Sequence, residues 1–324
     1  MRVLSGIQPS GSLHLGNWFG MMKRMIEYQD SHELFCFIVN YHALTSNLNG
    51  DALRHETLQA ACDFLALGLD PKKSVFWVQS DLAEVTELTW ILSNVTAMGL
   101  LERCHSYKDK IAQGLQPHHG LFSYPVLMAA DILIMGGERI PIGQDQKQHV
   151  EVARDIAMRF NHRYGETFVL PDVEIEPETA VIPGLDGQKM SKSYNNTIEI
   201  FIDDKRELKR KIDAYKTDST AVEDPKKVQD NNLYLLYSRF LDRKGREELK
   251  GRFLKPGLKY SDVKAELVEV IWKYFEAARE RRKAWAADRK KILKVLKEGA
   301  ERARSIARPM LEAVREKVGV AYAL

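Results

Sequence analysis

The sequence predicts an α/β fold in which a parallel-sheet domain is followed by an all-helical domain. In the first half of the chain, short apolar runs rich in β-branched and aromatic residues alternate with helix-like stretches. Such alternation is typical of βαβ units on a parallel sheet. The second half consists of charged helical segments without a strand signal. A length of 324 residues also suits about two domains.

The predicted strands of the first half are Arg2–Ile7, Leu34–Val39, Ser74–Gln79 and Arg139–Ile142. The helix-like stretches between them include Ala52–Leu67 and Leu82–Met98. In a parallel sheet of this kind, ligands bind at the carboxyl ends of the strands, where loops turn into helices. Functional residues are therefore expected in the loops that follow the predicted strands.

The pattern changes near Pro183–Gly187, a connector that contains glycine. Beyond it, apolar residues recur at helical spacing. The two clearest sets are Val263, Leu267, Val270, Ile271, Tyr274 and Ala278, and Leu293, Leu296, Ala300, Ala303 and Ala307. We predict a sheet domain over residues 1–186, a loop and connector over 187–200, and a helical domain over 201–324.

The composition indicates an ordinary globular chain. Hydrophobic residues make up 44% and charged residues 29% of it, which argues against a disordered protein. The three cysteines lack the paired spacing of a metal site, and no dedicated metal-ligand cluster is expected. The first residues contain no export segment, and no apolar run approaches about 18 residues. We expect a cytoplasmic protein without a membrane partner.

The positive charge of the chain is concentrated near its end. The formal net charge is only +3, but the range Arg279–Lys317 alone contains 14 Lys or Arg and 6 Asp or Glu residues. A basic block of this kind suits a polyanionic partner. A solvated helix face with extra lysines is the alternative, and the charge alone leaves both open.

The segment Gly6–Asn17 follows the first predicted strand and opens a helix. Its glycines allow close approach of the backbone to a ligand, and a helix N-terminus offers unpaired N–H groups to phosphate. His14 and Asn17 can add side-chain hydrogen bonds. The segment lacks the Gly-x-x-x-x-Gly-Lys pattern, so a P-loop NTPase is not expected.

A second segment, Gln188–Ser193, places Lys189 and Lys192 around a small residue on a loop flanked by glycine. Two lysines on a mobile loop can close over a phosphate chain and neutralise its charge as pyrophosphate leaves. A generic lysine pair is more often a solvated loop, so this segment is informative only together with the first one.

Taken together, in this order and about 175 residues apart, the two segments resemble the HIGH and KMSKS signatures of class I aminoacyl-tRNA synthetases. The first reads His14-Leu15-Gly16-Asn17, with Asn in place of the final His, as in the tryptophanyl and tyrosyl subgroup. The resemblance implies a Rossmann-type sheet domain that couples an amino acid to ATP and then to tRNA.

A third segment, Tyr124–Leu133, carries Asp131 within an otherwise apolar run. A buried carboxylate needs a hydrogen-bond donor. Tyr124, Met128 and Asp131 share one helix face, and an apolar residue beside an acceptor suits a flat aromatic ring that carries one N–H or O–H. Taken alone, an aspartate such as Asp131 is more often hydrogen-bonded within the protein.

This segment closely resembles the tryptophanyl pattern of the family, and agreement extends through Gly6–Asn17, Tyr41–Thr45, Pro141–His149 and Arg159–Asn161. The resemblance implies ATP as a substrate with Mg²⁺ bridging its phosphates, L-tryptophan, a tRNA with a CCA anticodon read by the helical domain, and a homodimer. A tyrosyl enzyme is one alternative. A non-charging tryptophan sensor is another, although it predicts damage to the first two motifs, and both are intact.

The resemblance also assigns residues to roles. The catalytic set is His14, Asn17, Lys189, Ser191 and Lys192. The ATP-binding set is Gly6, Gln8, Pro9, Ser10, Gly16, Asn17, Lys110, Gly143, Asp145, Lys189, Met190, Ser191 and Lys192. The tryptophan-binding set is Leu4, His42, Tyr124, Met128, Asp131, Ile140, Ile142 and Gln146. Three positions depart from the family pattern: an aromatic residue is common at Leu4, Asp at Asn40 and Glu at Gln144.

Overall fold

The structure is a computed structural model that describes residues 1–9, 11–46, 49–104, 114, 116–143, 146–175 and 182–322. The chain forms two compact units that interleave in the sequence. The sheet unit comprises Met1–Gly11, Met25–Glu176 and Ala284–Leu324, and the helical unit comprises Ser12–Arg24 and Pro177–Lys283.

The sheet unit contains a five-stranded parallel sheet in the order β3-β2-β1-β4-β5. Its strands are β1 (Arg2–Ile7), β2 (Glu33–Ile38), β3 (Val75–Val78), β4 (Arg139–Ile142) and β5 (Asp172–Ile175). The first four confirm the predicted strands to within a residue. The sequence analysis missed β5, a four-residue edge strand whose acidic residues mask the apolar signal. The predicted Rossmann-type arrangement is confirmed.

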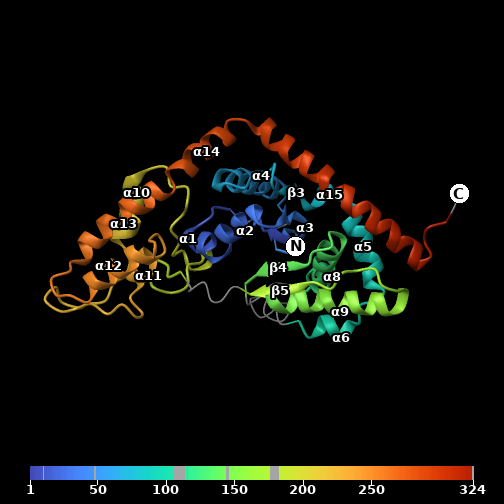
Figure 1. The fold of residues 1–324 in the computed structure, drawn as a ribbon, viewed down its shortest axis with the longest axis horizontal. Helices are drawn as coiled ribbons and strands as arrows, with labels where there is room; N and C mark the ends of the chain where they lie inside the picture. Colours follow the sequence, from blue (N-terminus) through green and yellow to red (C-terminus); the bar gives the residue numbers. More distant parts are fainter. Residues whose placement is uncertain are drawn as a thin grey trace. The chain divides into compact units, whose positions relative to one another are not determined.

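The helices and turns of the sheet unit, in chain order, are η2 (Tyr28–Asp30), α3 (Asn40–Ala43), α4 (Gly50–Leu67), η3 (Gln79–Asp81), α5 (Glu84–Ser93), α6 (Met98–Glu102), α8 (His119–Ile134), α9 (Lys147–Tyr164) and α15 (Arg289–Val318). The strand order reverses direction between β1 and β4. Since crossovers between parallel strands are right-handed, the reversal places α4 on one side of the sheet and α8 and α9 on the other, as Figure 1 shows.

The stretch predicted as one helix over Leu82–Met98 is divided into α5 and α6. Two short polar side chains end α5. Asn94 Nδ2 donates to the carbonyl of Trp90 at 2.7 Å, and Thr96 Oγ1 donates to the carbonyl of Leu92 at 2.8 Å. Such local bonds compete with the helical ladder, which periodicity of apolar residues does not reveal.

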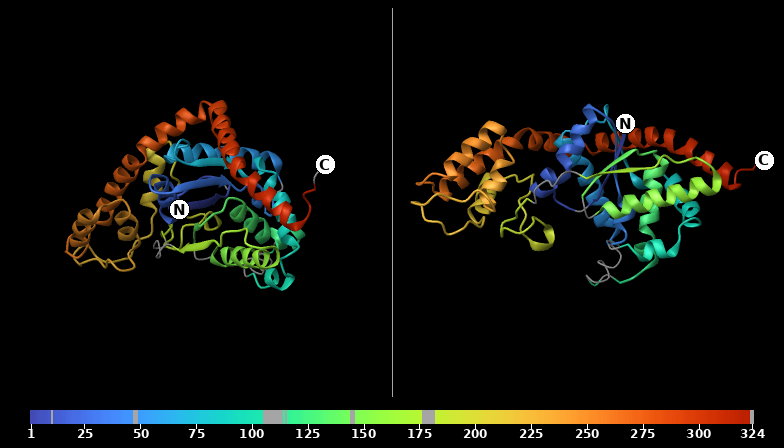
Figure 2. Two further views of the ribbon diagram at one scale, coloured as in Figure 1. Left: turned by 45° about the vertical axis from the view of Figure 1, so that its right-hand side comes forward. Right: turned by 60° about the horizontal axis from the view of Figure 1, so that its bottom comes forward.

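Helix α15 covers the open edge of the sheet at β3 and also packs against α4, α5 and α8 (Figure 2). A glycine permits the approach, because a Cβ atom built at Gly299 would lie 1.8 Å from the carbonyl oxygen of Phe76. Arg302 donates to the carbonyls of Pro71 and Ser74, both at 2.9 Å. A covered edge offers no template for pairing with another chain.

Part of the basic block is therefore used inside the sheet unit. Arg308 pairs with Glu84 at 3.1 Å, and Arg315 contacts Glu87 with Nε 2.5 Å from Oε1. These residues hold α15 against α5. The earlier part of α15 has exposed cations instead, among them Lys290, Lys291 and Lys294.

The helices and turns that lie wholly in the helical unit are α1 (Leu15–Asn17), η1 (Trp18–Met22), η5 (Lys192–Tyr194), α10 (Lys205–Asp213), α11 (Asn232–Ser238), α12 (Arg243–Phe253) and α13 (Tyr260–Tyr274). Two further helices, α2 (Lys23–Glu27) and α14 (Glu276–Ala286), cross the boundaries between the units. Trp18 and Phe19 pack against aromatic side chains of this unit. Trp18 Nε1 donates to the hydroxyl of Tyr274 at 3.2 Å, and the Phe19 ring meets Phe240 with centroids 4.9 Å apart.

The helical unit resumes at Pro177 rather than after residue 186, and two further segments lie in the other unit than predicted. The aromatic contacts of Trp18 and Phe19 attach Ser12–Arg24 to the helical unit, and the contacts of α15 attach Ala284–Leu324 to the sheet unit. Both differences come from long-range packing. Among the helices of the described ranges, none combines the length and apolarity that a membrane span requires.

Candidate active site

Within the helical unit, the first and second sequence motifs lie in contact. The backbone N–H of Leu15 donates to the carbonyl of Ile198, and that of Ile200 donates to the carbonyl of Leu13, both at 2.9 Å. This short antiparallel pairing lies just after the lysine loop. The N–H of Gly16 also donates to Met190 Sδ at 3.3 Å. Two segments that are far apart in the sequence thus form one cluster.

Gly16 is required at its position by this contact. A Cβ atom there would lie 2.9 Å from Nδ1 of His14 and 3.2 Å from Cβ of Met190. Asn17 stabilises the start of α1, because its Oδ1 accepts the backbone N–H of His14 at 3.1 Å. Met190 is buried, which fixes the middle of the lysine loop.

His14 is a buried imidazole held in its neutral form. Burial, and to a smaller extent the positive charge of Lys192, lower its pKa to about 4, and Glu199 partly opposes the shift. Its Nδ1 atom is buried and has no hydrogen-bond partner among the residues that the structure describes. A neutral histidine can donate a hydrogen bond to a phosphate oxygen without adding a positive charge next to the lysines.

The lysine loop is organised by Asn196, a buried residue that the sequence analysis did not select. Its Oδ1 accepts the N–H of Ser191 at 2.8 Å. Its Nδ2 donates to Asp186 Oδ1 at 2.7 Å and to the carbonyl of Lys189 at 3.1 Å. The bond from Asn196 is the main reason that the pKa of Asp186 lies below its ordinary value. One side chain therefore fixes both ends of the loop.

The two lysines of this loop are exposed, whereas Ser191 is half-buried. Gly187 has φ +85°, which suits the glycine at the turn of the loop. With its backbone held and both lysine side chains exposed, the loop presents ammonium groups at the surface.

The remaining predicted ATP-binding residues belong to the sheet unit. Gly6 and Gln8 are exposed at the end of β1, and Gly143 is exposed at the end of β4. Pro9 is buried. These two strands flank the point at which the strand order reverses, where ligands of such sheets bind. Ser10, Lys110 and Asp145 lie outside the described residues.

Asp131 lies on α8 with an exposed fraction of only 4%. His42 Nε2 is 2.9 Å from its Oδ2. Gln79 Nε2 donates to Oδ1 at 3.0 Å and to Oδ2 at 2.8 Å. Burial raises the pKa of Asp131, and the hydrogen bonds from His42 and Gln79 oppose that rise. A carboxylate offers about four acceptor positions, so three protein contacts leave capacity for one further N–H.

The predicted apolar slot residues lie in or against the core. Leu4 and Ile140 are buried members of the core, and Met128 and Ile142 are half-buried and pack against it. A Cβ atom at Gly137 would lie within 3.4 Å of both Leu4 Cβ and Ile140 Cδ1, so these two side chains converge. The structure thus places apolar side chains from β1, β4 and α8 in one cluster.

Tyr124 is half-buried on α8, and its hydroxyl bonds to Nε2 of His149. Its ring lies edge-on to that of His42, with centroids 6.2 Å apart. Tyr124 and His42 therefore lie on the same side of the site as Asp131. Gln146 is exposed and occupies the N-cap position of α9, where its side chain makes no capping hydrogen bond.

Gln79 is the second functional residue that sequence reasoning missed. It has an exposed fraction of 1% and follows β3 directly, at the carboxyl edge of the sheet. A polar residue immediately after an apolar strand was a usable signal. No comparable signal marks Asn196, because its role depends on the return path of the loop.

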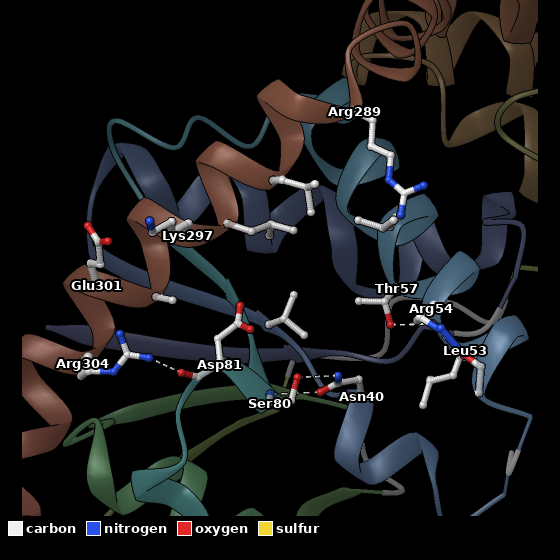
Figure 3. Close-up of a pocket in the computed structure, with 16 residues that line it drawn as sticks. Asn40, Leu53, Arg54, Thr57, Ser80, Asp81, Arg289, Lys297, Glu301 and Arg304 are labelled. Carbon is white, nitrogen blue, oxygen red and sulfur yellow. Dashed lines mark hydrogen bonds between the residues drawn. The ribbon is translucent and has the colours of Figure 1, made fainter.

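A cavity of about 640 Å³ opens between α4, α15 and the end of β3 (Figure 3). None of the predicted site residues lines it. Its wall includes Asn40, whose amide exchanges hydrogen bonds with Ser80, at 2.8 Å to Oγ and at 3.1 Å from the backbone N–H. These two bonds use both the donor and the acceptor of the Asn40 amide, which explains why an asparagine fits at this position. Within the described ranges, no group of three or more His, Cys, Asp or Glu residues could hold a metal ion.

Comparisons with known proteins agree with this geometry. Residues 1–276 match the family of class I tRNA synthetases (W and Y). The chain is 51% identical to the tryptophan–tRNA ligase of Campylobacter jejuni over 320 residues, which cover 99% of this chain and 100% of the relative. It is 50% identical to that of Fusobacterium nucleatum, covering 98% of each.

A solved structure is also similar. It is the tryptophanyl-tRNA synthetase of Campylobacter jejuni complexed with ADP and tryptophan. It matches with a TM-score of 0.92 at 51% identity and covers 98% of this chain and 100% of that one. The similarity therefore extends through both units, including the part beyond residue 276. The chain belongs to the W and Y family of class I tRNA synthetases, on its tryptophanyl branch.

Proposed function

We propose that this chain is a tryptophan–tRNA ligase. It activates L-tryptophan with ATP to tryptophanyl-adenylate and pyrophosphate, and then transfers tryptophan to its tRNA. The observation that carries the proposal is the contact between the first motif and the lysine loop, through Gly16 and Met190. The extent of identity with tryptophan–tRNA ligases supports the choice of amino acid.

The chemistry needs no enzyme nucleophile. A carboxylate oxygen of tryptophan attacks the α-phosphorus of ATP, and the bond from that phosphorus to the bridging oxygen of the β-phosphate breaks. Catalysis then consists of positioning and neutralisation of charge. Lys189 and Lys192 bind the departing pyrophosphate. His14, kept neutral by burial, donates a hydrogen bond to a phosphate oxygen. Asn17 keeps the helix start in place.

ATP would enter as its Mg²⁺ complex, in which the ion would neutralise part of the phosphate charge. Gly6, Gln8 and Gly143 provide exposed backbone and an amide at strand ends for the nucleotide. Ser191 and the backbone of Met190 continue the phosphate-binding surface of the loop. Ser10, Lys110 and Asp145 are proposed for the same ligand by resemblance alone.

On the amino-acid side, Asp131 accepts the indole N–H with its remaining acceptor capacity. Leu4, Met128, Ile140 and Ile142 form the apolar slot. His42, Tyr124 and Gln146 bind the polar groups of the substrate. A site that pairs a buried acceptor with an N–H rejects analogues without that N–H by about 10⁴ to 10⁵.

The tRNA and a second copy of the chain are the proposed macromolecular partners. Exposed Lys290, Lys291 and Lys294 supply charge for an RNA backbone, and the helical unit is proposed to read the CCA anticodon. Trp90 on α5 and Met98 on α6 have exposed fractions of 72% and 62%. Exposed apolar side chains of this size suit a homodimer interface. Leu92, on the same helix as Trp90, is fully buried in the core and is not available for such an interface.

The test is ATP–pyrophosphate exchange, followed by charging of a tRNA with a CCA anticodon. We expect exchange with tryptophan and not with tyrosine, and a loss of orders of magnitude for Asp131→Ala without a loss of ATP affinity. Exchange with tyrosine would favour the tyrosyl alternative. Tryptophan binding without exchange would favour the non-charging sensor. Near-normal exchange by Asp131→Ala would refute the role of that carboxylate.

A further inference from the structure

We propose that Gln79 is a positioning residue that gives the amino-acid site its selectivity for a ring N–H, by orienting Asp131. The inference rests on the proposed function, in which Asp131 accepts the indole N–H. Gln79 lies in no predicted site, and it acts on the substrate only through the carboxylate that it holds.

The contacts of Gln79 use the whole amide. Nε2 donates to both carboxylate oxygens of Asp131, at 3.0 and 2.8 Å. Oε1 accepts the backbone N–H of Tyr41 at 3.0 Å and that of His42 at 3.4 Å. One side chain thereby joins the end of β3, the start of α3 and the last turn of α8. With an exposed fraction of 1%, it has no water to replace these bonds.

These hydrogen bonds of Gln79 fix two properties that Asp131 needs in order to recognise an N–H group of the substrate. The first is direction, because an amide N–H that faces both oxygens from one side leaves the other lone pairs available to the substrate. The second is charge. A protonated carboxyl would present an O–H donor toward the indole N–H, and burial favours that protonated form. Donation by Gln79 favours the ionised acceptor.

His42 alone does not provide the same constraint. Its Nε2 reaches only Oδ2, at 2.9 Å, and its ring also faces Tyr124. Its own backbone is held by Oε1 of Gln79. Loss of Gln79 would therefore remove one partner of Asp131 and the backbone support of the other, without removing any group that touches the substrate.

The experiment compares two substrates that differ at one ring atom. Pyrophosphate exchange is measured with tryptophan and with 3-benzothienylalanine, whose ring sulfur replaces the N–H. The variant is Gln79→Met, which keeps the length of the side chain and removes the amide. We expect the ratio of kcat/KM for tryptophan to that for benzothienylalanine to fall by about tenfold or more, with the analogue affected much less.

The matched control is Ser80→Ala. It removes one of the two bonds that join the same turn to Asn40 of α3, but Ser80 faces the cavity rather than Asp131 (Figure 3). Its substrate ratio is expected to stay at the wild-type value. If Gln79→Met does not fold, Gln79→Asn shortens the donor by one methylene and is expected to lower the ratio in the same direction.

The outcomes separate the two claims. Equal losses for both substrates in Gln79→Met would make Gln79 a merely structural residue and overturn the inference. Asp131→Ala serves as the reference for the proposed function. If Asp131→Ala leaves the ratio unchanged, the proposed role of Asp131 is wrong. If it abolishes the ratio and the Gln79 variants do not lower it, only the inference fails. In the double variant that combines Gln79→Met with Asp131→Ala, the substrate ratio is expected to fall no further than in Asp131→Ala alone.

Discussion

Removing the side chain of Asn196 is expected to lower the turnover number of amino-acid activation while leaving the KM for tryptophan unchanged. Asn196→Ala deletes the acceptor of the Ser191 N–H and the donor to the Lys189 carbonyl and to Asp186. Asn196 has an exposed fraction of 2%, so water does not replace these bonds in a well-packed loop. The lysine loop would then occupy its folded geometry less often.

The size of the effect follows from the hydrogen bonds. Leaving a buried N–H without a partner costs about 1 to 3 kcal/mol. If the loop must adopt this geometry in the transition state, that cost reduces kcat by roughly 5- to 150-fold. The assay is tryptophan-dependent pyrophosphate exchange, with urea denaturation as a check that the variant is folded under the assay conditions.

An exchange of charges provides a sharper test of the same contact. Asn196→Asp places a second carboxylate 2.7 Å from Asp186 Oδ1 and should be more damaging than Asn196→Ala. Adding Asp186→Asn restores a donor–acceptor pair with its ends reversed, so part of the activity should return. The reasoning is refuted if folded Asn196→Ala has wild-type kcat, or if the double variant is no more active than Asn196→Asp.

Three further predictions concern single features of the structure. Because the pKa of His14 falls from 6.5 to about 4 on folding, the unfolded chain binds more protons between these values. Stability should therefore decrease as the pH falls through that range. His14→Gln should show a flatter dependence in urea titrations at pH 7 and pH 5, and an identical slope would contradict the shift. Gly299→Ala drives a methyl group against the backbone of Phe76 and should lower stability by about 1 to 3 kcal/mol or more. Gly251→Ala in α12, where a Cβ meets nothing within 4 Å, should raise stability by up to about 1 kcal/mol, and equal effects in thermal melts would contradict the close approach. Four cations of the basic block, Arg281, Arg282, Lys290 and Lys291, are the targets of the third prediction. Neutralising them should weaken tRNA charging and flatten its salt dependence, whereas unchanged charging would mean that the block is only a solubilising surface.

The prediction of the candidate site was strongest where residues adjacent in sequence act together. His14, Gly16 and Asn17 lie at one helix start, and the lysine loop is a continuous segment that contacts it. Tyr124, Met128 and Asp131 all lie on α8, as helical spacing indicates. The roles assigned to these side chains remain predictions that the experiments above test.

Apolar periodicity in this sequence was enough to locate β1 to β4, α4 and parts of α13 and α15, because each of these elements is stabilised by a repeat of residues over a few turns or pleats. It did not reveal β5, whose four residues carry too little pattern, or the break between α5 and α6, which depends on individual side-chain bonds to the backbone.

Only the tertiary structure decided the partners of buried polar groups and the course of the chain between units. The pairing of Gln79 with Asp131 and of Asn196 with Asp186 requires segments that the fold brings together. The return of α15 to the edge of β3 depends on the absence of a Cβ at Gly299, which a glycine within a helical pattern does not announce. Local sequence encodes local conformation through short-range sterics and patterning, whereas these contacts are selected by the free energy of packing distant surfaces.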